Sequence, residues 1–119
     1  MANTMSFYSN IDLDETKVAA VPRPAIIHWI FVFNQGATPA YVKLFNKAVG
    51  DVTVGSTAPD MTFPVPAQSD SNGAGFMIPL SGAIYFSTAV TIAATTGVEA
   101  SDSGAPGTND VIVNFGYTG

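Results

Sequence analysis

Glycine and proline recur so often through the middle of this sequence that a helix of useful length has no room to form. Nine of these residues fall between positions 50 and 82: Gly50, Gly55, Pro59, Pro64, Pro66, Gly73, Gly75, Pro79 and Gly82. Proline removes a backbone donor and glycine favours turns, so short extended pieces are predicted between them, at about 51–54, 60–66 and 75–80. The prolines in the second piece restrict it to a sheet edge or a strand end.

The next stretch, GAIYFSTAVTIAATTG at 82–97, contains no charged residue. Its apolar residues alternate with period two on both sides of 87–89, where a bend or bulge fits. The stretch therefore predicts two strands, or one long bent strand, near the centre of a sheet. We expect a buried central strand pair, and its outer residues, Thr91 and Thr95 among them, are candidates for contact with a second copy.

Three further segments have strand patterns. AIIHWIFVFN at 25–34 is rich in β-branched and aromatic residues and follows two prolines, so it predicts a strand that ends in a turn. AYVKLFNKA at 40–48 predicts a half-buried strand paired with 25–34, with a slip in its alternation near Phe45 that a bulge would absorb. VIVNFGYT at 111–118 predicts a last alternating strand after a long polar loop.

Seven or eight short strands without a persuasive helix predict an all-β fold, an antiparallel β-sandwich that is jelly-roll-like. A chain of 119 residues fits one domain of ordinary size. We expect a single β-sandwich domain at 25–119. Residues 1–24 differ in kind and predict an extended N-terminal arm or an edge segment.

Composition favours an assembly. Charged residues make up 11% of the chain, against roughly 25% in a typical soluble domain, which leaves an unusually uncharged surface. The formal net charge of −5 argues against nucleic acid and anionic membrane surfaces as partners. The N-terminus lacks the pattern of a secretory signal, and the longest apolar run is about nine residues against the ~20 of a membrane helix. We expect a protein that stays in the compartment where it is made, unless it leaves as part of a particle.

Candidates for chemistry are few. His28 is the only histidine and lies in the most apolar strand, which favours a barrel or interface histidine with one hydrogen bond over a general base or a metal ligand. The carboxylates of DLDE at 12–15 lack the glycine and the later glutamate of an EF-hand and indicate a solvated acidic segment. Turn hydrogen bonds are a sufficient role for Asp102 and Asp110. We therefore expect no enzyme activity, no catalytic residue, no cofactor and no metal site.

Four segments carry a resemblance to a known class of proteins. They are YVKLFNKA (41–48), TFPVPA (62–67), GFMIPLSGAIYFSTAVTIAATTG (75–97) and NDVIVNFGY (109–117). Taken together, these segments resemble small structural proteins of tailed-bacteriophage virions, in particular head decoration or cement proteins and related head-fibre modules. The resemblance implies a β-sandwich that assembles as homotrimers or other small oligomers on the capsid exterior, where it fastens neighbouring major capsid subunits.

Residues 1–24 lie outside this resemblance, which covers about 41–117. The segment fits an arm that reaches onto a neighbour, by strand addition or by filling a pocket. Its apolar residues are the candidate partner contacts: Phe7, Tyr8, Ile11 and Leu13. The expected partners are other copies of the chain and the major capsid protein, and the expected location is the outside of a virion made in the host cytoplasm.

Two other classes stay open. A head-fibre or receptor-binding module would recognise a host surface glycan with the loops at about 68–75 and 100–110. Aromatic residues that would stack on sugar rings are Trp29, Tyr41, Tyr85 and Tyr117. A small glycan hydrolase would need two carboxylates facing each other across a cleft, and the scattered acids make this class the least favoured.

Overall fold

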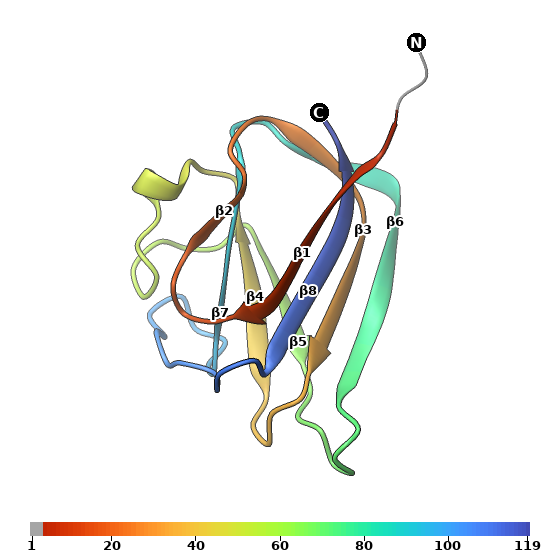
Figure 1. The fold of residues 1–119 in the computed structure, drawn as a ribbon. Helices are drawn as coiled ribbons and strands as arrows, with labels where there is room; N and C mark the ends of the chain where they lie inside the picture. Colours follow the sequence, from red (N-terminus) through yellow and green to blue (C-terminus); the bar gives the residue numbers. More distant parts are fainter. Residues whose placement is uncertain (1–3) are drawn as a thin grey trace.

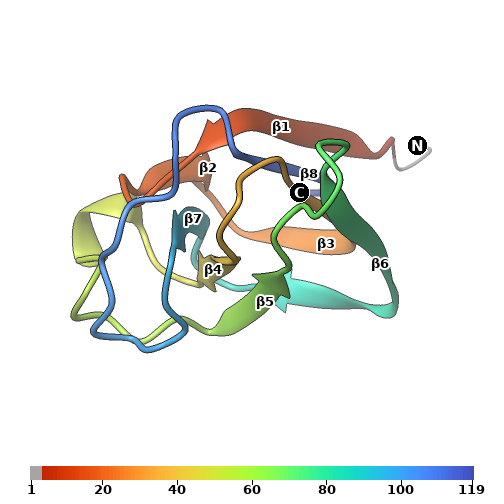
Figure 2. The ribbon, with the colours of Figure 1, turned by 90° about the horizontal axis from the view of Figure 1, so that it is seen from below.

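The computed structural model describes residues 4–119, which form an all-β chain with one short 3-10 helix, η1 (Val49–Asp51). Its eight strands are β1 (Ser6–Leu13), β2 (Val18–Val21), β3 (Ala25–Asn34), β4 (Ala40–Phe45), β5 (Met61–Val65), β6 (Ala74–Phe86), β7 (Val90–Thr95) and β8 (Val111–Thr118) (Figure 1). They form two antiparallel sheets, ordered β1-β8-β3-β6 and β2-β7-β4-β5, that lie in two layers (Figure 2). The prediction of an all-β fold is therefore confirmed, and the arrangement is sandwich-like.

The strands pair in a nested order. The first strand, β1, pairs with the last, β8. The pairing then continues inward along the chain: β2 pairs with β7, β3 with β6, and β4 with β5. Two further pairs, β3 with β8 and β4 with β7, complete the two sheets. The chain therefore runs as one long hairpin folded over on itself, and consecutive strands change sheet everywhere except at the tip between β4 and β5.

One hydrophobic core lies between the sheets. Along β8, Val111, Val113 and Phe115 point inward and are completely buried, as the alternation predicts. The ring of Phe115 lies 5.2 Å from the ring of Tyr8 and 5.8 Å from that of Tyr117. Because a buried aromatic side chain removes a large apolar area from water, this stack ties β1 to the centre of the core.

Several strand predictions are confirmed. The segments 25–34 and 111–118 form β3 and β8 with the predicted bounds. The piece at 60–66 forms β5, which is an edge strand, as its proline requires. The piece at 75–80 is the first part of the longer β6. The prediction of an extended piece at 51–54 is wrong, because the chain leaves η1 and enters a turn there.

The predicted hairpin between 25–34 and β4 is also wrong, because β4 lies in the other sheet and pairs with β5 and β7. The turn at 35–39 explains the change of sheet. Buried Asn34 donates from Nδ2 to the carbonyl oxygen of Thr38 at 2.9 Å, and its Oδ1 accepts from the Gly36 amide at 2.7 Å. This turn carries the chain across the core. The register of β4 with β7 is continuous through Phe45, without the predicted bulge.

The uncharged stretch at 82–97 is divided between the sheets. The bend falls at 87–89 as predicted, because β6 ends at Phe86 and β7 begins at Val90. β7 is a central strand and all its residues are buried. β6 is an edge strand of the other sheet, and Tyr85 near its end is exposed. The prediction of a central, buried strand pair is therefore right for β7 and wrong for β6.

The N-terminal segment supplies an edge strand to each sheet, β1 against β8 and β2 against β7. The register shifts between Asn10 and Leu13, and again between Ala19 and Val21, as expected where an edge strand bends. An edge segment describes residues 6–21 better than a free arm does. Residues 1–3 of the predicted arm lie outside the described residues.

Candidate functional site

The outer face of the β2-β7-β4-β5 sheet is covered by the chain itself. Loops at 46–60 and 96–110 lie on the side of this sheet that faces away from the core (Figure 2). Phe45 and Ala93 pack there with Val52 in a second, smaller cluster. The ammonium of Lys17 donates to the carbonyl oxygen of Val52 at 2.5 Å, which holds the first of these loops.

Thr91 and Thr95 of β7 point to this covered face and are completely buried. Their hydroxyl groups donate to the carbonyl oxygens of Lys47, at 2.7 Å, and Gly97, at 2.8 Å. Both acceptors belong to the covering loops. The prediction that these threonines are candidates for contact with a second copy is therefore wrong, because the chain's own loops take that place.

Lys43 lies under the second loop and is 1% exposed. Its Nζ donates to the carbonyl oxygen of Glu99 at 2.7 Å. Burial lowers the pKa of Lys43 from its ordinary value of 10.5, and the nearby charges of Asp102 and Glu99 offset part of that shift. The lysine thus ties β4 to the loop at the cost of a desolvated charge.

We expect the stability of the protein to rise with pH in the alkaline range through Lys43. Because its pKa is lowered only in the folded state, the unfolded chain holds a proton that the folded chain has lost between that lowered value and 10.5. Urea unfolding at neutral pH and just below pH 10.5 measures the effect. As pH rises, the unfolding free energy of wild type should increase relative to that of Lys43→Met. Lys47→Met, which removes an exposed lysine, is the matched control. Parallel pH profiles for wild type and Lys43→Met would contradict the assignment.

The outer face of the β1-β8-β3-β6 sheet, in contrast, carries large apolar side chains that are exposed. Phe7 is 75% exposed, Ile11 67% and Met77 60%. They lie on the two edge strands, and the half-buried residues of the central strands lie between them. We call this set the outer apolar face: Phe7, Ile11, Trp29, Phe31, Phe33, Met77 and Ile112.

The strand register explains how the aromatic rings lie on this face. Trp29 is paired with Gly116, and a Cβ at Gly116 would meet the Trp29 indole and, at 2.6 Å, the sulfur of Met5. Phe33 is paired with Gly75, whose missing side chain leaves room for its ring. Phe31 lies beside Phe33 with ring centroids 6.0 Å apart. Glycine on the neighbouring strands thus lets two rings of β3, those of Trp29 and Phe33, lie against the sheet.

The polar groups of this face are uncharged apart from Asp12 at its edge. Along the outward positions of the regularly paired residues, Ser9 and Asn114 separate the apolar side chains, and the one carboxylate among these strands' exposed residues belongs to Asp12, beside Ile11. Asp12, at the bulge of β1, accepts a hydrogen bond from the Asn109 amide at 2.6 Å. The Oδ1 atom of Asn114 is buried and accepts no hydrogen bond from residues 4–119. A surface of this kind is dehydrated at low cost by another apolar surface.

The predicted contact residues of the N-terminal segment divide into two groups. Phe7 and Ile11 lie on the outer apolar face and are exposed. Tyr8 is half-buried and its ring stacks on Phe115, and Leu13 is 1% exposed within the core. The structure therefore leaves Phe7 and Ile11 accessible to a partner, while Tyr8 and Leu13 hold β1 in its own domain.

The structure also places the residues considered for chemistry. His28 Nε2 and the hydroxyl of Thr118 form one hydrogen bond of 2.9 Å, as predicted for an interface or barrel histidine. The Asp14 carboxylate accepts from the Thr16 amide at 2.9 Å, and the Asp102 carboxylate accepts from the Gly104 amide at 2.8 Å. These are turn interactions, as predicted for Asp102. Within residues 4–119 the acids and the histidine form no group of three or more that would hold a metal ion.

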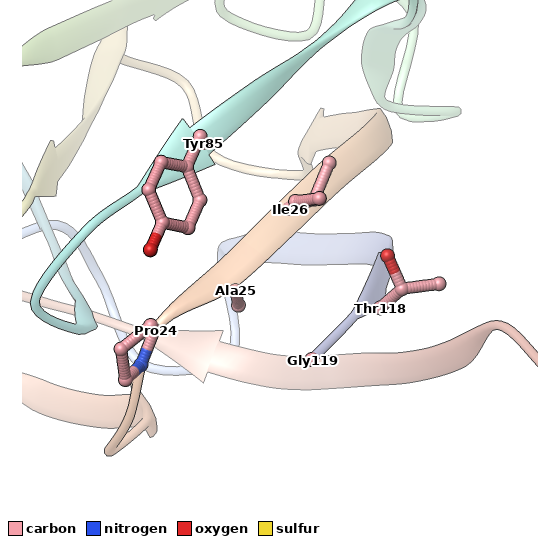
Figure 3. Close-up of a pocket in the computed structure, with 6 residues that line it drawn as sticks. All are labelled: Pro24, Ala25, Ile26, Tyr85, Thr118 and Gly119. Carbon is pink, nitrogen blue, oxygen red and sulfur yellow. The ribbon is translucent and has the colours of Figure 1, made fainter. Parts of the chain in front are cut away.

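The loops proposed for glycan recognition lie at one end of the molecule, on either side of the turn at 35–39. The Gln35 amide donates to the Asp110 carbonyl oxygen at 2.7 Å, and the Gln68 amide donates to that of Gly36 at 3.0 Å. A shallow hollow of about 370 Å³ lies elsewhere, between β3, β6 and the end of β8. Tyr85 and Ile26 stand beside it (Figure 3). Of the four aromatic candidates, Tyr85 is 64% exposed, and the other three are half-buried.

No protein-family model matches the chain, and no curated protein matches its sequence. Within the part of the chain that the structure describes, no helix has the length and hydropathy to cross a bilayer.

Proposed function

We propose that this protein is a virion structural protein, a capsid decoration or cement protein that binds the outside of a phage head and stabilises contacts between major capsid subunits. The observation that carries the proposal is the outer apolar face. A surface of exposed Phe7, Ile11 and Met77 marks a site of protein association, because monomeric proteins rarely leave a large contiguous apolar patch in water. The resemblance of the segments at 41–117 supplies the class of assembly.

The pairing order supports the finer fold assignment in this proposal. Strands that pair first with last, and so on inward to β4 and β5, form the wrapped hairpin of a jelly roll. Jelly rolls occur in viral capsid proteins and in lectins. Because one fold serves several functions, this observation supports the class of protein and leaves the function to the surface.

The proposed action is mechanical. A decoration protein that binds only the expanded shell shifts the shell's equilibrium toward that state and stabilises it by mass action. The protein acts as a small oligomer, a homotrimer in the simplest case, with the major capsid protein as its partner. Phe7 and Ile11 are the exposed members of the predicted contact set.

Sedimentation with purified heads tests the proposal. Heads of the phage whose genome encodes the chain are prepared without it, in the unexpanded and the expanded form, and each is mixed with the protein. We expect saturable binding to expanded heads, weaker binding to unexpanded heads, and retention of packaged DNA to a higher temperature. Protein that stays in the supernatant with both kinds of head would contradict the proposal.

The hollow at Tyr85 favours a second candidate, a head-fibre or receptor-binding module. An exposed tyrosine beside Ile26 and Thr118 offers an aromatic platform with a neighbouring hydroxyl group, a combination that suits a sugar ring (Figure 3). Binding to a panel of host surface glycans tests it. Binding that is lost in Tyr85→Ala and retained in Met77→Ala, a change at an exposed residue of the same strand, would support this candidate.

A further inference from the structure

We propose that the outer apolar face binds the same sheet of a second copy of this chain. The inference rests on the proposed structural role and deepens it, because it assigns this face to contacts between copies and leaves the capsid to other surfaces. The size of the face, its charge and its contrast with the opposite face support this assignment.

The face is large enough for a stable contact between copies. Four strands spaced by about 4.8 Å, with ten residues of about 3.3 Å along β3, span a flat area of roughly 600 Å². Side chains that rise above the sheet increase the accessible area beyond this value. A standard protein interface buries about 800 Å² on each partner, so the whole face is of the size that such an interface needs.

The charge of the chain restricts where a second copy can bind. With nine acidic and four basic residues, two copies repel each other wherever their charged surfaces approach. The outer apolar face is the region where they meet with the fewest acids brought together, because its outward residues are uncharged apart from Asp12 at its edge. A strongly basic or acidic partner would find no cluster of opposite charges on this face. A second copy offers the same aromatic and aliphatic side chains, of the kind enriched at the centres of interfaces.

The contrast with the opposite face supports the same conclusion. The β2-β7-β4-β5 sheet also has apolar and polar side chains on its outer side, and there two loops of the chain bury Phe45 and Thr91. The β1-β8-β3-β6 sheet has rings at the outward positions of β3. Gly73, just before β6, lies against the ring of Phe33, and the side chains of Phe7 and Met77 on the two edge strands stay exposed. Trp29, Phe31 and Phe33 are half-buried within one copy, so a second copy would complete their burial.

Light scattering after size exclusion, over a range of concentrations, tests the inference on three proteins. Wild type is expected to have two or three times the mass of 12.3 kDa. Met77→Glu places a charge at an exposed position of the face, beside Phe31 on the edge strand β6, and a mass near that of one copy is expected. Val98→Glu is the matched control, since Val98 is 53% exposed in the loop over the opposite sheet and the change in charge is the same. It is expected to retain the wild-type mass, and circular dichroism checks that all three proteins are folded.

The outcomes separate this inference from the proposed function. A wild-type mass of one copy at every concentration would overturn the inference, as would an unchanged assembly in Met77→Glu. Binding of the same proteins to expanded heads is measured in parallel. If Met77→Glu keeps the assembled mass but no longer binds heads, the face belongs to the capsid contact, so the inference fails and the proposed function stands. If Met77→Glu becomes a single copy and no protein binds heads, the inference stands and the proposed function fails.

Discussion

Replacing Phe115 by alanine is expected to lower the free energy of unfolding by about 3–5 kcal/mol, the range for truncating a fully buried aromatic side chain. The ring lies in the centre of β8, which pairs on both sides, with β1 and with β3. Its loss leaves a cavity beneath Tyr8, whose ring stacks on it, and Tyr117, whose ring is tilted against it. Because a domain of this size is stable by only about 5–15 kcal/mol, this single change removes a large fraction of the total.

Urea unfolding followed by circular dichroism measures this effect. Tyr117→Phe is the matched control, because it keeps the neighbouring ring and removes only a half-buried hydroxyl group. We expect the control to differ from wild type by less than about 1 kcal/mol. A loss in Phe115→Ala that is no larger than the loss in the control would contradict the assigned core.

Gly75→Ala is expected to cost about 2–3 kcal/mol, in the upper part of the range for overpacked sites. A Cβ at this position of β6 would meet the carbonyl oxygen of Val32 and would lie 2.8 Å from the Cα atom of Phe33. These are backbone atoms of the paired strand β3, so they cannot move aside without separating the two strands. The substitution should also displace the Phe33 ring from the outer apolar face.

Gly82→Ala is the matched control for this prediction. Gly82 lies in the same strand, and a Cβ there would have no neighbour within 4 Å. Its replacement should change the unfolding free energy by no more than about 0.5 kcal/mol. Thermal unfolding of the two variants side by side makes the comparison, and equal melting temperatures would show that Gly75 is not required for the approach of β3 and β6.

Local pattern predicted the strands of this protein better than it predicted their partners. The bounds of β3 and β8 follow from β-branched and aromatic runs bounded by turns, and the edge position of β5 follows from Pro64. Pairing of β3 with β4 was predicted because adjacent strands commonly form hairpins. The buried side chain of Asn34 shapes a turn that changes sheet, and a propensity argument does not reveal such a turn.

The candidate surface was predicted only in part. Phe7 and Ile11 were found as apolar residues in a polar segment, and both are exposed. The rest of the face was missed, although the sequence of β3 contains the signal. Trp29, Phe31 and Phe33 occupy one side of a strand whose other side, with Ile30 and Val32, fills the core. A strand that is apolar on both sides must be covered on both sides.

The prediction for Thr91 and Thr95 failed for the opposite reason. Alternation correctly placed both residues on one side of β7, but it does not tell which side a distant loop covers. The hydrogen bonds to Lys47 and Gly97 are formed with loops that follow β4 and β7. Which sheet remains open therefore depends on where these long loops fold, and the sequence gives no local signal for that choice.

The most direct test of the central claim, that the outer apolar face is buried between copies, is acrylamide quenching of the fluorescence of Trp29. This residue is the one tryptophan of the chain and lies on that face. Quenching is measured on wild type at concentrations where light scattering gives the assembled mass, and on Met77→Glu as the single copy. We expect weaker quenching and a shorter emission wavelength in the assembled protein. Equal quenching and equal emission in the assembled and single-copy proteins would contradict the claim, because copies would then associate through another surface.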